Sequence, residues 1–401
     1  MAAARYLLSL LSIERSFLER GLISGMFLAV ALDMGGQMGI RDIVLPACAA
    51  MLIGIRRVAF PRRFAPLFFL LVLYPTALLA VGVLKNADLS VAVSQYRSTV
   101  LAFLLLVILS DSSYETLARA LYASIGFTAL VAVVLAVSLS LDLRVFDDLI
   151  RGLHEDSAGY FGMREVGESF VPNIYFTVTL FYVPAALYFL YGGRHLPFLA
   201  CLAGLIAAVS KAGMVFVLLG AVVFLLKKGK PASKLVVGAA VCIVILFVFQ
   251  SPVMKLFFEI QEGRSGTVEA RVGHLVSISR LFSDHPLGFF FGFGLGTEFY
   301  SEGFGQYVWN IELDHLNCIR KYGFLWSCVF FGVVLQAAFR AVRSEIPGVR
   351  VLGVCLLSAF VVAGTNPVLI SPVFFLILFV TMLANLQSAS RGDPDAQPEI
   401  P

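Results

Sequence analysis

The sequence predicts an all-α protein that crosses a lipid bilayer many times. Of its 401 residues, 59% are hydrophobic and only 14% are charged, and the mean hydropathy is +0.89. A soluble domain is usually about 45–50% apolar and about 25% charged. The apolar residues also gather in runs of roughly 20, the length that a helix needs to span a bilayer. A soluble enzyme, a nucleic-acid-binding module and a disordered chain are therefore excluded.

The apolar runs, taken in order, predict about twelve spans within a single membrane domain, 1–401. Each run ends where charged residues or a cluster of Gly and Pro interrupts it, so these breaks define the expected boundaries. The expected spans are 21–35, 39–55, 64–84, 98–110, 117–141, 171–191, 196–210, 212–226, 235–250, 323–339, 348–366 and 369–386.

The basic residues predict how these spans are oriented. Short loops rich in Lys and Arg stay on the cytoplasmic side of a membrane. Three such breaks, 56–63, 227–234 and 340–350, fall on the same side as both ends of the chain. We therefore expect a multi-pass protein with both termini in the cytoplasm.

Two long polar segments are expected on the opposite side, at 142–170 and 251–322, and both are rich in Asp and Glu. Long connections without regular structure are uncommon and usually functional. The tail 387–401 is polar and rich in Pro, and we expect it to be disordered.

The first outer loop and the break after the next span contain three candidate ligand residues. Arg164 lies shortly before an expected span, and Asn173 follows Pro172, a residue suited to the first turn of a helix. Asn173 is expected to cap that helix or to contact a ligand. Lys211 separates two short spans, where an ionisable residue is costly. The alternatives are a headgroup-contacting Arg164 and a snorkelling Lys211 at a plain turn.

The long outer loop contains an amphipathic pattern that predicts a helix over 268–283. Arg271 and His274 lie one turn apart and share a face of it. The sequence Asp-His-Pro at 284–286 ends the helix. The glycines that follow, at 292, 294 and 296, are expected to permit close backbone packing.

The end of this loop contains the candidate general bases Glu312, Asp314 and His315. If the segment is helical, Glu312 and His315 share one face, and Asp314 and Asn317 share the adjacent one. A carboxylate or an imidazole at a water-exposed helix start can act as a general base, and ordinary interfacial polarity explains these residues equally well. One His with two acids is too little for a metal site, so no metal is expected.

Four motifs, in this order, resemble the O-antigen polymerase and ligase superfamily. The first two are Arg-x-x-Gly followed by Pro-Asn before a span, and Ser-Lys-x-Gly between two short spans. The last two are Arg with a later His-Pro-Leu-Gly and Gly-x-Gly, and Glu-x-Asp-His-x-Asn ending in Tyr-Gly, and all four lie within about 160–326. Members are integral-membrane glycosyltransferases of the bacterial inner membrane with a GT-C-like helical fold. The resemblance implies a donor glycan on undecaprenyl pyrophosphate at the periplasmic face, with no cofactor.

The resemblance also implies residue roles. The residues expected to hold the pyrophosphate are basic: Arg164, Lys211 and Arg271, with Arg97 and Arg280 as further candidates. Lys211 stands where the family often has Arg, and Lys offers phosphate only a point charge. The expected catalytic residues are Glu312, Asp314 and His315, and the other expected substrate contacts are Asn173 and His274.

The implied activity is polymerisation of lipid-linked oligosaccharide repeat units, of O-antigen or exopolysaccharide, with inversion at the anomeric carbon. Glu312, Asp314 and the Tyr-Gly ending favour the polymerase, whereas His315 leaves open a ligase that transfers glycan to lipid A–core. A transporter of lipid-linked sugars and a structural scaffold are the other classes. The implied partners are lipid-linked glycans as donor and acceptor, membrane lipid and, by analogy, a regulator of chain length. No nucleic acid is expected.

Overall fold

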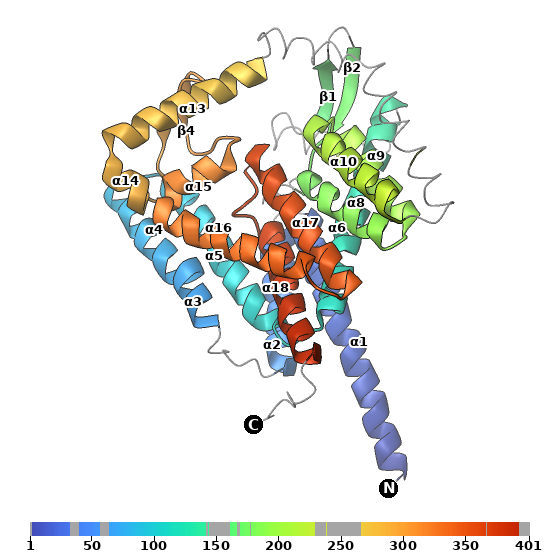
Figure 1. The fold of residues 1–401 in the computed structure, drawn as a ribbon. Helices are drawn as coiled ribbons and strands as arrows, with labels where there is room; N and C mark the ends of the chain where they lie inside the picture. Colours follow the sequence, from blue (N-terminus) through green and yellow to red (C-terminus); the bar gives the residue numbers. More distant parts are fainter. Residues whose placement is uncertain are drawn as a thin grey trace.

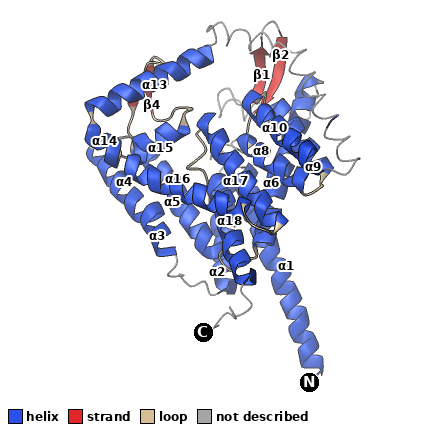
Figure 2. Ribbon diagram, in the orientation of Figure 1, coloured by secondary structure: helices blue, strands red, loops and turns tan. Residues whose placement is uncertain are grey.

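The computed structural model describes residues 2–32, 40–56, 64–141, 143, 161–166, 169–176, 178–228, 238, 266–365 and 367–392. This part of the chain is predominantly helical and includes two small antiparallel β-hairpins (Figures 1 and 2). Within it, five helices are long and apolar enough to cross a membrane, and five shorter ones are also apolar. The all-α membrane class is thereby confirmed, whereas a total of twelve spans is not.

Within the first 140 residues, the described part forms five helical units. They are α1 (Ala2–Leu32), α2 (Ile40–Arg56), a continuous helix made of α3 (Ala65–Phe68), the π-turn η2 (Phe69–Leu73) and α4 (Tyr74–Leu84), then α5 (Leu89–Leu109) and α6 (Tyr114–Ser140). Asp88 caps α5, since its Oδ1 accepts hydrogen bonds from the backbone N–H groups of Ser90 and Val91. This cap corrects the predicted span 98–110: the helix begins nine residues earlier, at Leu89, and Arg97 lies inside it.

The middle of the chain begins with a β-hairpin and continues as three apolar helices. These elements are β1 (Phe161–Val166), β2 (Ser169–Ile174), η4 (Thr179–Phe181), α8 (Tyr182–Tyr191), α9 (His195–Ala207) and α10 (Lys211–Lys228). The predicted span 171–191 is therefore wrong at its start. Pro172 and Asn173 pair with Met163 and Gly162 across the hairpin, so they neither start nor cap a helix. A two-stranded ribbon tolerates the missing N–H of Pro because both strands are edges.

The last third contains the amphipathic helix, a second hairpin and the C-terminal helices. Its elements are α13 (Gly266–Asp284), α14 (Pro286–Phe291), β3 (Phe299–Ser301), β4 (Gln306–Val308), α15 (Asp314–Tyr322), α16 (Phe324–Val342), α17 (Pro347–Val362), η5 (Ala363–Thr365) and α18 (Pro372–Gly392). The helix predicted at 268–283 and its end before Pro286 are confirmed. α18 continues through 387–392, so this part of the tail predicted to be disordered is helical, and 393–401 lie outside the described residues.

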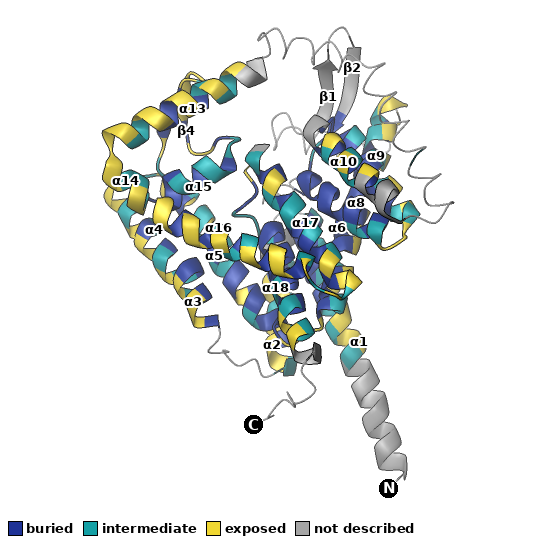
Figure 3. Cartoon of the chain, viewed as in Figure 1, coloured by how far each residue is buried: buried dark blue, intermediate teal, exposed yellow. Residues whose placement is uncertain are grey.

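The core centres on α8, which packs against α9, α10 and α17. Eight of its ten residues are buried, which is expected of a helix that is apolar on every side (Figure 3). In contrast, α16 exposes large apolar side chains such as Val329 and Phe339, a surface suited to lipid. Figure 1 shows α13 and the β1–β2 hairpin at one end of the molecule, with the N-terminus of α1 at the other.

The segment after α14 packs its backbone directly against α4, α5 and α15. Leu295 N donates to Leu78 O at 3.1 Å. A Cβ atom on Gly82 would lie 2.1 Å from Leu295 O, and one on Gly292 would lie 2.5 Å from Lys321 O. The predicted close packing around the glycines is confirmed. The backbone of this segment is therefore held close to three helices.

Candidate active site

A cavity of about 450 Å³ lies between α5, α15 and the segment that follows η5. It brings together two predicted site residues that are more than 200 positions apart in the sequence, Arg97 and Asp314. The other polar side chains that line it are Ser94, Gln95, Ser98, Asn310, Asn317, Lys321, Tyr322 and Ser371.

One face of α15 supplies the charged and amide groups of this cavity. Asp314, Asn317 and Lys321 are spaced by three and four residues, so they lie on one side of the helix. Asp314 is the first helical residue, where a carboxylate is favoured by the helix dipole. The helix ends at Gly323, whose φ of +84° breaks the path into α16.

Asp314 is almost fully buried, with only 3% of its surface exposed. Its Oδ2 accepts a hydrogen bond from the backbone N–H of Leu369, 2.5 Å away. Burial raises the pKa of the Asp314 carboxyl, and this bond, the nearby Lys321 and Asn317 only partly offset the effect. Asp314 is consequently a stronger base than an exposed aspartate.

Lys321 is also buried, at 8% exposure, and its Nζ donates to Asn310 Oδ1. Burial lowers the pKa of the Lys321 ammonium, Arg320 lowers it further, and Asp314 opposes both. Burying two such charges is expensive unless they stabilise each other. Ionisable groups perturbed in this way inside a cavity are typical of functional sites.

Arg320 holds the walls of the site in place. It is 1% exposed and donates to the backbone oxygens of Thr297, at 2.9 Å, and Trp309, at 2.6 Å. Its guanidinium also lies 4.7 Å from the centre of the Phe299 ring. Burial lowers the pKa of Arg320, yet a guanidinium remains protonated at neutral pH. Arg320 thus contributes a buried positive charge next to Lys321.

A second group of predicted residues lies on α13, outside the cavity. Arg271 forms a 3.0 Å ion pair with Glu312, and both side chains are partly exposed. His274 is buried, with its Nδ1 2.6 Å from Ser301 Oγ, and burial lowers its pKa. Arg280 forms a separate ion pair with Glu302 at 2.6 Å.

The structure separates the three candidate bases. Glu312 precedes α15, so the prediction that Glu312 and His315 share a helix face is wrong. The His315 ring instead packs edge-on against Phe331 and Phe360, with centroids 5.3 Å and 4.6 Å away, and burial lowers its pKa. Of the three, Asp314 lines the cavity.

The remaining predicted residues belong to the β1–β2 hairpin and to α10. Arg164 pairs with Val171 on the backbone, and Lys211 is the first residue of α10. Both side chains lie outside the described part, so a pyrophosphate cage made of Arg164, Lys211 and Arg271 stays a prediction. Asn173 is buried on β2.

Sequence reasoning missed Lys321 and Asn310 as site residues. The signal for Lys321 was present, because it lies two helical turns after Asp314 with Asn317 between them. Asn310 precedes the helix and carries no such signal.

No protein-family model matches the chain, and the curated proteins give no match either.

Proposed function

We propose that this protein is a metal-independent, inverting glycosyltransferase of a bacterial inner membrane. It would polymerise undecaprenyl-pyrophosphate-linked oligosaccharide repeat units at the periplasmic face, and both of its termini would be cytoplasmic. The observation that carries the proposal is the cavity in which the buried carboxylate of Asp314 faces the same space as Lys321 and Arg97. The motif resemblance supports it independently.

In this proposal Asp314 is the general base. Its carboxylate takes the proton from an acceptor sugar hydroxyl while the hydroxyl oxygen forms a bond to the anomeric carbon of the donor. The bond between that carbon and the diphosphate oxygen breaks, and undecaprenyl pyrophosphate leaves with the electron pair. A base of raised pKa, as burial gives Asp314, accepts a proton more readily at neutral pH.

Lys321 and Arg97 stabilise the negative charge that develops on the leaving diphosphate. Fixed cations in a site with little water stabilise such charge more than they would in bulk solution. Arg97 can bind two phosphate oxygens at once, whereas Lys321 acts as a point charge. Arg271 lies outside this cavity, where it forms an ion pair with Glu312.

The test is an assay with purified full-length protein in detergent, an undecaprenyl-pyrophosphate-linked oligosaccharide, EDTA and no nucleotide. A ladder of longer lipid-linked glycans on a gel supports the polymerase. Asp314→Asn should slow the ladder by about a hundredfold or more, as expected for loss of a general base. Asp284→Asn, which changes an exposed carboxylate at the end of α13, is the matched control and should leave the rate unchanged.

Three results would contradict the proposal. Glycan that appears only on added lipid A–core would assign the protein as a ligase. Movement of the lipid-linked sugar across a liposome membrane without any product would assign it as a transporter. Equal rates for Asp314→Asn and the wild type would remove Asp314 from the mechanism.

A further inference from the structure

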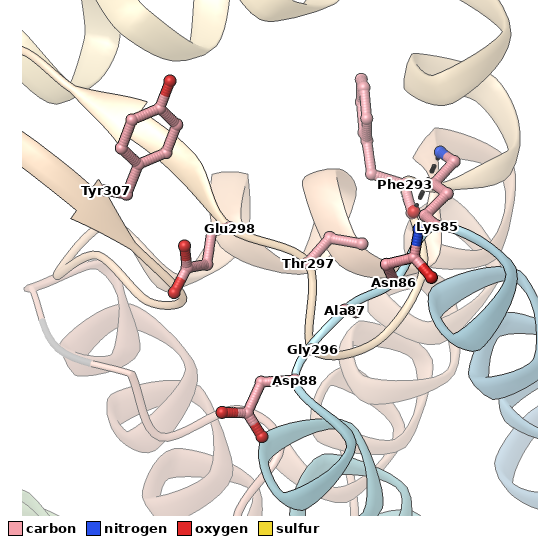
Figure 4. A pocket seen from close by; sticks show the side chains of 9 residues that line it. All are labelled: Lys85, Asn86, Ala87, Asp88, Phe293, Gly296, Thr297, Glu298 and Tyr307. Carbon is pink, nitrogen blue, oxygen red and sulfur yellow. Dashed lines mark hydrogen bonds between the residues drawn. The ribbon is translucent and has the colours of Figure 1, made fainter.

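Figure 4 shows a second cavity, of about 550 Å³. Its walls come from the turn between α4 and α5 and from the segment that leads from α14 through β3 to β4. The charged and tyrosine side chains that line it are those of Lys85, Asp88, Glu298 and Tyr307. The mechanism above uses none of them.

One side of this cavity combines an aromatic ring with two carboxylates. Figure 4 shows Tyr307, Glu298 and Asp88 gathered on the same side of the segment through Gly296 and Thr297. Tyr307 is 67% exposed, and its ring packs edge-on against Tyr300 with centroids 5.6 Å apart. An exposed ring offers a rigid apolar face, while ionised carboxylates accept strong hydrogen bonds from hydroxyl groups. Pyranose sugars present these two features, an apolar C–H face and a rim of hydroxyls.

The charges of the cavity disfavour an anionic ligand. Asp88 is ionised, because hydrogen bonds from Ser90 and Val91 lower its pKa. Lys85 is directed towards Phe293, with its Nζ 3.1 Å from the backbone oxygen and 5.3 Å from the centre of the ring. The carboxylates would repel a diphosphate or a uronic acid, and they suit neutral sugars and amino sugars.

A hydrogen bond connects residues that line the two cavities. Gln95 lines the first and Gly296 lines the second, and the N–H of Gly296 donates to Gln95 Oε1 at 3.0 Å. A molecule with a charged diphosphate and an uncharged glycan could place one part in each cavity. The cations of the first cavity would bind the diphosphate, and the tyrosine ring and carboxylates of the second would contact the sugars.

We propose that the second cavity is a glycan subsite that binds neutral or amino-sugar residues of the lipid-linked substrates through Tyr307, Glu298 and Asp88. The presence of a glycan rests on the proposed function, whereas the recognition chemistry rests on the cavity itself. The subsite would hold the sugar chain while its reacting end lies at Asp314.

The probe is an array of lipid-free bacterial surface glycans, incubated with the full-length protein in detergent. Ligands identified on the array are then titrated in solution. Tyr307→Ala and Glu298→Gln should each weaken binding by about tenfold, the loss of one good contact. Two matched controls should bind as the wild type does. Phe291→Ala removes an exposed aromatic ring on α14, and Glu269→Gln neutralises an exposed carboxylate on α13.

Lipid-free glycans carry no diphosphate and cannot be transferred, so this test is separate from the test of catalysis. Asp314→Asn should retain glycan binding while it loses polymerisation. Binding through Tyr307 in a protein that forms no polymer would support the subsite and overturn the polymerase. Absence of binding to any glycan, or equal affinity of Tyr307→Ala and the wild type, would overturn the subsite.

Discussion

At the scale of single residues, the decisive feature is a buried acid and a buried base on one face of a short helix. Asp314 and Lys321 line the same cavity, and burial moves their pKa values towards each other. In isolation, each would be an unpaired charge away from water, which is strongly destabilising. Together, in a cavity that also contains Arg97, they form the site that we propose for proton transfer beside a negative leaving group.

This pair predicts a bell-shaped pH profile for the rate of the proposed transferase. Asp314 acts as a base only when it is deprotonated, and burial raises its pKa above the ordinary 3.8, so the rate falls as the pH decreases through that raised value. Lys321 acts only when it is charged, and burial lowers its pKa below the ordinary 10.5, so the rate also falls as the pH rises. Initial rates measured across the pH range should therefore rise to a maximum and then fall.

The conservative variant Lys321→Arg tests the alkaline limb. Arg remains protonated at every accessible pH, so this limb should move to higher pH while the acidic limb stays in place. An unchanged alkaline limb would mean that another group controls it. The temperature of unfolding of the variant shows separately whether the larger side chain disturbs the buried site.

At the scale of elements, the segment after α14 lines the second cavity and is hydrogen-bonded to Gln95, which lines the first. The backbone N–H of Leu295 donates a hydrogen bond to the α4 backbone, and the backbone N–H of Phe293 donates one to the backbone oxygen of Arg320. These contacts require glycines because the backbones approach closely, and Gly82 is the closest case. A rigid segment fixes the cavity walls relative to each other, which a catalytic site requires.

Gly82→Ala should destabilise the protein by about 1–3 kcal/mol, the usual cost of overpacking. The added Cβ would lie 2.1 Å from the backbone oxygen of Leu295, which cannot rotate away as a side chain can. Thermal unfolding in detergent measures the effect. Gly332→Ala is the matched control, since nothing lies within 4 Å of its Cβ on α16. Equal melting temperatures for the two variants would contradict the packing argument.

At the scale of the whole molecule, the two ends differ in the elements that they contain. α13 and the β1–β2 hairpin lie at one end, and the N-terminus of α1 lies at the other (Figure 1). The short connection between α16 and α17 is flanked by Arg343 and Arg350. The positive-inside rule therefore predicts that this connection is cytoplasmic and that α13 is periplasmic.

Cysteine labelling in cells tests this orientation in a background without native cysteines. Asp284→Cys, at the exposed end of α13, should react with a membrane-impermeant maleimide from the periplasm. Glu345→Cys, exposed between α16 and α17, should react only after the inner membrane is permeabilised. The reverse pattern would invert the topology and place both cavities on the wrong side for a periplasmic polymerase.

The sequence by itself determined the membrane class, most helix positions, the amphipathic α13 and the close packing at the glycines, because hydropathy, periodicity and glycine act locally. It did not predict that Pro172 lies in a strand, because pairing with β1 overrides the local preference for a helix start. Only the tertiary structure showed that Arg97 and Asp314 line the same cavity. It also showed that Glu312 forms an ion pair with Arg271 and that His315 packs against Phe360. Sequence spacing places residues on a helix face, whereas the packing of α15 against α4, α14 and α16 determines what each face contacts.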